Sequence, residues 1–365
     1  MTANANCVHV LTRKFCYPLP DTVPARLVLQ ARLGLQAWRL RSLRTHAAPS
    51  TDSTAEGVYM SSFVELPPTE YSATAFTSFD PGATNFTTGN ALALMWSSQL
   101  AYETGKPRTI DVVGDTWKFA SVFPFSKQKV DIVASFDTTG ILGERADAII
   151  LAFAGTDPAV WETLATDFNI RLTKDTDTHI GFQAALDAAR PEIDRAIAMS
   201  QHTGKPLYIA GHSLGAALAA LAASFAASSG SPPKAVYTFG MPRVGGEQFQ
   251  TAYNANLGSV TYRLVHGLDV VARVPMSELG YRHVGCVLQC ESGKKFDPAA
   301  MSPLVSDVPE FSLGLAHTLV SSIESLLSGH SLSLPGPGTF GPLFKYLPPP
   351  IRDHLQDRYY NALTP

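Results

Sequence analysis

A serine near the middle of the sequence stands in a setting that could make it a nucleophile. Ser213 lies in Gly-His-Ser-Leu-Gly, residues 211–215, between an apolar run at 207–210 and an alanine-rich stretch. This order predicts a strand, a sharp turn and a helix, and the two glycines leave room where any side chain would clash in such a turn. The helix would direct its N-terminal amide groups at the reacting centre. The pattern therefore predicts a nucleophile elbow.

A serine hydroxyl needs an imidazole to accept its proton and a carboxylate to hold that imidazole. After an elbow of this kind the chain order is Ser, then Asp or Glu, then His. Asp269 fits the second place because it follows an apolar strand at 260–265, and loops at the carboxyl ends of parallel strands hold active sites. The alternative for Asp269 is a solvated loop residue or a cap.

The histidines after Asp269 are His283, His317, His330 and His354. We favour His354 as the base, because it lies where a loop leads into a short terminal helix and its imidazole could swing over the elbow. His283, at the start of a predicted strand, is the alternative.

An ester-cleaving serine also needs two hydrogen-bond donors for the oxyanion. The first is expected to be the backbone N–H of Leu214, the residue after the serine. The second is expected to be Thr156, which follows an apolar strand at 148–153 and carries both an N–H and a hydroxyl. By its local sequence alone, Gly-Thr at 155–156 is also typical of an ordinary turn at a strand end.

Helical and strand patterns alternate from residue 85 onward, which predicts a sheet covered by helices. Several predicted strands are continuous apolar runs, as expected for parallel strands buried on both faces. The predicted strands are 148–153, 207–210, 235–239, 260–265 and 283–288, and the predicted helices include 89–104, 181–200 and 216–229.

Composition excludes several classes of protein. With 28 basic and 31 acidic residues among 365, the net charge of -3 argues against a nucleic-acid partner. No stretch is long and apolar enough to predict a membrane-spanning helix. The four cysteines are too few for a disulfide scaffold, and Cys286 and Cys290 lie too far apart along one predicted strand to pair. No metal-ligand spacing occurs, so neither metal nor cofactor is expected.

Residues 1–59 differ in charge from the rest, with seven basic and three acidic side chains. We expect them to be a disordered extension or a targeting segment, with Met60 as an alternative start. Residues 60–365 would form the catalytic domain, with an apolar insertion at about 292–349. No clear secretory signal is visible. A cytoplasmic or membrane-peripheral location is therefore slightly favoured, and the oligomeric state is left open.

The sequence resembles the class 3 lipase family of α/β-hydrolases over roughly residues 85–290 and 350–362. The motifs that carry the resemblance lie at 150–156, 179–182, 211–215, 237–245, around Asp269 and at 353–354. The resemblance implies an α/β-hydrolase fold, a mostly parallel central sheet with helices on both faces. It also implies a triad of Ser213, Asp269 and His354, with Thr156 and Leu214 at the oxyanion positions. Two departures are Ala154, where the family often has Arg, and Gly246, where it commonly has Asn.

The expected function is that of a serine carboxylic-ester hydrolase, most favoured as a lipase acting on acylglycerols or related lipid esters through an acyl-enzyme. A phospholipase A1 or short-chain carboxylesterase is the alternative, and a non-catalytic lipase-like interaction protein is the alternative of a different class. The resemblance implies a lid helix at 157–165. Trp161 and Leu164 lie on its apolar stripe, which could cover the cleft or meet a lipid–water interface. The alternative is that this stripe simply packs into the core.

Overall fold

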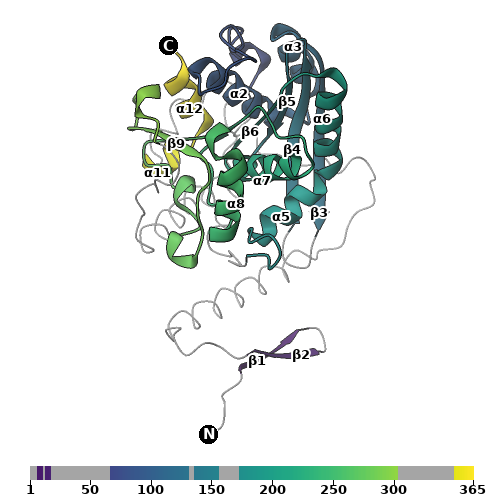
Figure 1. Cartoon of the computed structure of the whole chain (residues 1–365), viewed down its shortest axis with the longest axis vertical. Coiled ribbons are helices and arrows are strands. Elements are labelled where there is room, and N and C mark those ends of the chain that lie inside the picture. The colour runs from purple at the N-terminus through teal and green to yellow at the C-terminus, as the bar shows by residue number, and fades with distance from the viewer. Residues whose placement is uncertain (1–5, 11–12, 18–65, 131–134, 156–171, 303–348) are drawn as a thin grey trace, which may run out of the picture. The chain divides into compact units, whose positions relative to one another are not determined.

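The computed structural model of the chain describes residues 6–10, 13–17, 66–130, 135–155, 172–302 and 349–365. The chain divides into two compact units, Met1–Gly57 and Val58–Pro365. In the first unit, β1 (Asn6–Val10) and β2 (Arg13–Tyr17) pair as an antiparallel hairpin. All other described elements belong to the second unit (Figure 1). The role assigned to residues 1–59 stays a prediction.

A seven-stranded sheet forms the centre of the second unit, with its strands in sequence order from β3 to β9. The first two neighbouring pairs are antiparallel, and β5 to β9 run parallel. The predicted mostly parallel sheet is therefore confirmed. The strands are β3 (Phe119–Val130), β4 (Ser135–Arg145), β5 (Ile149–Phe153), β6 (Leu207–His212), β7 (Ala235–Phe239), β8 (Thr261–His266) and β9 (Cys286–Cys290).

Helices cover both faces of this sheet (Figure 1). Alternate strand residues point to opposite faces: Ile150 and Ala152 of β5 join one buried cluster, whereas Ile149 and Leu151 join the other. The first cluster includes α2 (Thr88–Leu100), α3 (Pro107–Thr116) and α12 (Gln356–Leu363). The second includes α5 (Ile180–Ala188), α6 (Arg190–Thr203), α7 (Leu214–Ser228) and α8 (Glu247–Leu257). This two-sided cover confirms the predicted fold class, an α/β fold whose mostly parallel central sheet has helices on both faces.

Short elements connect the layers. They are η1 (Pro68–Glu70), η2 (Ala101–Glu103), η3 (Gly258–Val260), η4 (Val271–Arg273), η5 (Ser277–Leu279), η6 (Pro298–Ala300) and α11 (Pro349–Arg352). No described helix is long and apolar enough to span a lipid bilayer. Cys286 and Cys290, at the two ends of β9, are free cysteines.

Two of the predicted elements differ from the structure for an identifiable physical reason. The helix predicted at 181–200 is two helices, α5 and α6, and Pro191 lies in the first turn of α6. A proline in a first turn lacks only an N–H that would have no partner within the helix. Inside one continuous helix the same proline would remove a hydrogen bond and interrupt the helix. The strand predicted from His283 begins at Cys286 instead. Gly285 has a φ of +76°, which is not extended backbone and prevents pairing before that point.

Candidate active site

Ser213 occupies a strained turn between β6 and α7. Its backbone has φ 62° and ψ -130°, a region that side-chain-bearing residues rarely adopt. A Cβ added to Gly211 would lie 2.1 Å from the carbonyl oxygen of Gly215, so the turn closes too tightly for a side chain there. The Ser213 hydroxyl is buried and has no hydrogen-bond partner within the described part of the chain. A hydroxyl with no structural bond in a strained elbow fits a nucleophile rather than a turn serine.

Asp269 and His354 are brought together from positions 85 residues apart. Asp269 follows β8, and His354 lies in the turn between α11 and α12. Nδ1 of His354 lies 3.0 Å from Oδ1 and 2.9 Å from Oδ2 of Asp269. Since a carboxylate only accepts, Nδ1 carries the proton, and Nε2 is left as the basic nitrogen.

Asp269 is fully buried and yet ionised. Burial raises the pKa of its carboxyl, but His354, the Tyr359 hydroxyl and the Val271 N–H together outweigh burial and lower that pKa. The Val271 N–H donates to Oδ1 over 2.8 Å, and the Ala272 N–H does so over 3.4 Å. Asp269 therefore caps the turn at η4 and contacts His354 at the same time.

The serine and the Asp269–His354 pair lie at the same edge of the sheet. The N–H of Ser213 donates to the Phe239 carbonyl at the end of β7, over 2.9 Å. At the next residue, Gly240, an added Cβ would lie 2.6 Å from Oδ2 of Asp269 and 2.9 Å from Nδ1 of His354. This edge is formed by the carboxyl ends of the parallel strands, where active sites of open α/β sheets lie.

The oxyanion positions are described in part. Leu214 is the first residue of α7, where backbone N–H groups have no partner within the helix. Gly155, which follows β5, packs directly against the nucleophile: a Cβ there would lie 2.6 Å from the Cβ of Ser213. Thr156 lies outside the described residues, so its role stays a prediction. The same holds for Trp161 and Leu164 of the predicted lid and for the apolar stretch at 303–348.

His283 is not the partner of Asp269. Its Nε2 lies 2.8 Å from the Ala272 carbonyl, so Nε2 carries the proton and donates it to that oxygen. Burial, with a smaller contribution from Arg263 and Arg243, holds the pKa of His283 well below its ordinary value. These contacts make His283 a buried structural histidine. His317 and His330 lie outside the described residues.

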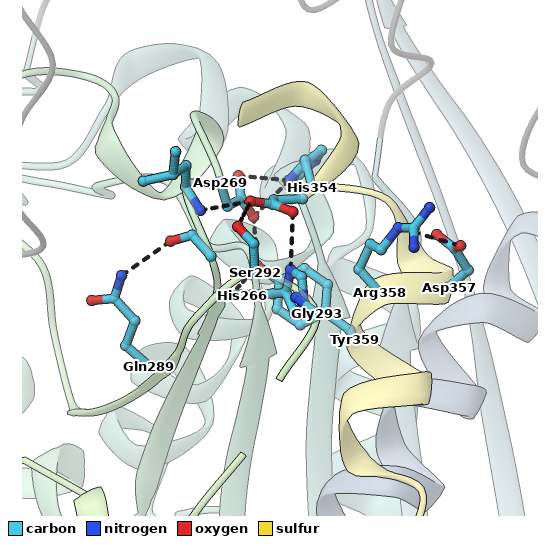
Figure 2. Close-up of polar contacts among 12 residues, drawn as sticks. His266, Asp269, Gln289, Ser292, Gly293, His354, Asp357, Arg358 and Tyr359 are labelled. Carbon is cyan, nitrogen blue, oxygen red and sulfur yellow. Dashed lines mark hydrogen bonds and ion pairs between the residues drawn. The ribbon is translucent and has the colours of Figure 1, made fainter. Parts of the chain in front are cut away.

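A second buried carboxylate, Asp353, supports the turn that carries His354, and Figure 2 labels two of its neighbours, His266 and Ser292. Asp353 accepts hydrogen bonds from the Leu268 N–H, over 2.9 Å, and from the Ser292 hydroxyl, and His266 Nδ1 lies 3.4 Å from its Oδ1. Five residues around the candidate site were not predicted from the sequence: Asp353, His266, Tyr102, His212 and Tyr359. Two signals were present, since His212 lies inside the elbow motif and Asp353 directly precedes the proposed base.

The described residues contain no group of three or more His, Cys, Asp or Glu side chains that could hold a metal ion.

The sequence matches the family described as lipase (class 3) over residues 150–279. It is 37% identical over 108 residues to a secreted mono- and diacylglycerol lipase 1 of Fusarium solani, covering 29% of this chain and 32% of that protein. It is 33% identical over 155 residues to a phospholipase A1-II 1 of Oryza sativa subsp. indica, and the match covers 41% of this chain and 37% of that protein. The chain thus spans about a third of these two relatives. A solved structure of a triacylglycerol lipase superposes with a TM-score of 0.48 at 20% sequence identity. The superposition covers 62% of this chain and 91% of the chain of that lipase.

The expected cytoplasmic or membrane-peripheral location is wrong. Similar proteins from Fusarium solani, Penicillium cyclopium and Malassezia globosa are named secreted lipases. The expectation had rested on the lack of a recognisable signal in residues 1–59, and such a lack carries no information about the compartment.

The matched region contains all of β5 except Ile149, together with the elbow and Asp269. His354 completes the candidate site from outside the matched region. The sequence match and the geometry agree: residues 150–279 are similar to the class 3 lipase family, and the residues of the candidate site that lie in this range have the positions described above.

Proposed function

We propose that this protein is a serine carboxylic-ester hydrolase that acts on acylglycerols or related lipid esters. The observation that carries the proposal is the arrangement at one sheet edge: a strained Ser213, whose hydroxyl has no hydrogen-bond partner among the described residues, and a buried Asp269–His354 pair at the same edge. A non-catalytic role is disfavoured, because a protein without turnover has no need to keep a costly backbone conformation at Ser213.

The proposed reaction proceeds through an acyl-enzyme. Nε2 of His354 takes the hydroxyl proton as Ser213 Oγ attacks the ester carbonyl, while Asp269 holds the imidazole and its positive charge. The N–H of Leu214 and the donors of Thr156 stabilise the oxyanion. His354 then protonates the departing alcohol. Water attacks the acyl-enzyme with the same base, which releases the carboxylic acid and restores Ser213.

The substrate class is supported by the names of the relatives. Two of them are mono- and diacylglycerol lipases from Fusarium solani and Penicillium cyclopium, which makes partial acylglycerols the first substrates to test. A phospholipase A1 is the second candidate, supported by the Oryza sativa relative. The predicted lid at 157–165, with Trp161 and Leu164, would give the protein a contact with a lipid–water interface.

A hydrolysis panel tests the proposal. The purified full chain and its Ser213→Ala variant are assayed on a soluble p-nitrophenyl ester, a diacylglycerol emulsion and phosphatidylcholine vesicles. We expect the wild type to release fatty acid from the diacylglycerol, and Ser213→Ala to lose nearly all turnover with its circular dichroism spectrum unchanged. Phospholipid hydrolysis without acylglycerol hydrolysis would favour the second candidate. Equal turnover by wild type and Ser213→Ala would refute the enzyme assignment.

The catalytic domain is proposed to be residues 60–365. A chain beginning at Met60 is then expected to match the full chain in melting temperature and esterase rate. A large fall in the melting temperature of the shortened chain would show that residues 1–59 stabilise the catalytic unit.

A further inference from the structure

A line of three hydrogen bonds runs beneath the proposed active site. Tyr102, in η2, is buried and accepts a hydrogen bond from the Gly155 N–H over 2.8 Å. The Tyr102 hydroxyl lies 3.0 Å from Nδ1 of His212. Nε2 of His212 lies 2.8 Å from the backbone carbonyl oxygen of His354. The line therefore joins the segment after β5 to the turn between α11 and α12 through the last residue of β6.

The direction of every bond follows from its partners. The His354 carbonyl can only accept, so Nε2 of His212 carries a proton. Burial, reinforced by nearby His354, lowers the pKa of His212 to about 3, so the ring is neutral and its Nδ1 is an acceptor. The Tyr102 hydroxyl must then donate to Nδ1, while its oxygen accepts from Gly155. Each of the three bonds therefore joins a donor to an acceptor.

The two ends of the line are the backbone of Gly155 and the backbone of His354. Both must be correctly positioned relative to Ser213 for ester cleavage. Gly155 packs against Ser213 and directly precedes Thr156, the proposed second oxyanion residue. The other end is the backbone of the proposed base, whose ring also stacks on the ring of His212 with centroids 4.7 Å apart. His212 itself directly precedes the nucleophile.

We propose that Tyr102 is a positioning residue, whose hydroxyl fixes the backbone after β5 and the backbone of His354 relative to each other through His212. This inference rests on the proposed function, because it concerns the same ester hydrolysis. Tyr102 acts on the geometry of the transition state, in which oxyanion donors and base must be placed to within about 0.5 Å. Ground-state binding of the ester needs no such accuracy.

The Tyr102→Phe variant removes the hydroxyl and keeps the ring. With a soluble p-nitrophenyl ester we expect kcat to fall by about 10-fold to 100-fold, below the loss caused by removing an oxyanion donor itself. KM is expected to change by no more than about 2-fold, since uniform binding is unaffected. The inhibition constant of an alkyl trifluoromethyl ketone, which forms a tetrahedral adduct with the serine, should rise by the same factor as kcat/KM falls. The affinity of a non-hydrolysable ether analogue should stay unchanged.

Tyr253→Phe is the matched control. Tyr253 is equally buried, and its hydroxyl lies 2.9 Å from Oγ1 of Thr261, on the face of the sheet covered by α8. It also loses one buried hydroxyl, so it reports the effect of general destabilisation. We expect it to lower the melting temperature while kcat and the ketone affinity stay at wild-type values. Equal kcat in wild type and Tyr102→Phe, or equal losses in both Phe variants, would refute the positioning role.

A measurement on the unaltered protein covers the case in which Tyr102→Phe does not fold. Nitrogen-15 spectra of histidine-labelled protein should show His212 neutral, with its proton on Nε2, at neutral pH. A proton on Nδ1 would reverse the line and refute the inference. If the wild type instead hydrolyses no ester at all, the proposed function fails first, and this result is distinguishable because it needs no variant of Tyr102.

Discussion

Tyr359 donates its phenolic hydrogen to Oδ2 of Asp269, the oxygen that His354 Nδ1 also approaches (Figure 2). The direction is fixed because the His266 N–H donates to the same phenolic oxygen over 3.2 Å. Burial, reinforced by the charge of Asp269, raises the pKa of Tyr359 well above its ordinary value, so the phenol stays neutral. The orienting carboxylate is thus held ionised in part by a buried neutral donor that comes from the helix next to the base.

Tyr359→Phe is expected to destabilise the protein in a pH-dependent way. A hydrogen bond to a charged group contributes about 1.5–3 kcal/mol, and the loss of this one should raise the pKa of Asp269. A carboxyl with a lowered folded-state pKa stabilises the fold above its unfolded pKa, and this stabilisation is lost as pH falls through the folded value. The difference in unfolding free energy between wild type and Tyr359→Phe should therefore be largest near pH 7 and shrink below the ordinary Asp range. Urea denaturation over a pH series measures it.

Tyr253→Phe is again the control, since its hydroxyl meets the neutral hydroxyl of Thr261 rather than a carboxylate. Its destabilisation should not depend on pH over the same range. If the two variants show parallel pH profiles, Tyr359 does not influence the ionisation of Asp269.

His354→Ala and His283→Ala should differ in kind. His354→Ala is expected to reduce kcat by several orders of magnitude with little change in fold, because triad members act as a unit. His283→Ala should leave kcat close to wild type and lower the melting temperature, because it removes a buried hydrogen bond to the Ala272 carbonyl. Both are measured on a soluble ester at matched concentrations of folded protein. A greater loss of kcat in His283→Ala would reverse the assignment of the base.

The sequence was sufficient to predict the parts of the site whose signal is local. The apolar runs of β5 to β8 and the glycines around Ser213 carry their own pattern, and the structure has strands and an elbow there. The antiparallel strands β3 and β4 were not predicted. β3 contains Pro124 and several polar residues, which an edge strand tolerates but which weaken the strand signal.

Residues that act through distant partners had no local signal. Tyr102 meets His212 from 110 positions away, and Tyr359 meets Asp269 from 90. Before folding, a tyrosine near the end of a helical pattern is an ordinary amphipathic residue. Its hydrogen-bond partner depends on how the helices pack on the sheet. Spacing along the chain therefore does not reveal that partner.

We predict that the protein loses stability in mildly acidic solution, because burial lowers the pKa of three of its histidines. Burial lowers the pKa of His179 to about 4 and that of His212 to about 3, and it holds the pKa of His283 well below its ordinary value of 6.5. Below pH 6.5 these imidazoles bind protons in the unfolded chain but stay neutral in the folded chain. The free energy of unfolding therefore falls as the pH falls. The slope should approach about 4 kcal/mol per pH unit if all three contribute. Urea denaturation between pH 7 and pH 5 would measure this slope.

His179→Asn tests the contribution of one histidine. His179 Nδ1 accepts hydrogen bonds from the Gly181 and Phe182 N–H groups at the start of α5, over 3.1 and 3.3 Å. Asparagine is a good residue at such a helix start and does not titrate. The variant should fold, and its slope should be lower by about 1.4 kcal/mol per pH unit. An unchanged slope would mean that His179 is protonated equally in both states.

Asp353→Asn should weaken the support of the proposed base. Burial raises the pKa of Asp353, but the nearby His266 ring and the hydrogen bonds from the Leu268 N–H and the Ser292 hydroxyl outweigh burial and lower it. An asparagine keeps one acceptor oxygen and turns an NH₂ toward a donor, which leaves a buried group unpaired. We expect a loss of about 1–3 kcal/mol in unfolding free energy, and a several-fold fall in kcat because the neighbouring His354 is less firmly held.

Asp357→Asn is the matched control, four residues further along the same segment. Burial raises the pKa of Asp357, and its Oδ1 is buried without a partner in the described structure, so a neutral amide of the same shape should be tolerated within about 0.5 kcal/mol. Its kcat on a soluble ester should match the wild type. If Asp357→Asn lowers kcat as much as Asp353→Asn does, the effect belongs to the charge of the whole C-terminal segment, and the bonds from Leu268 and Ser292 to Asp353 have no special part in placing His354.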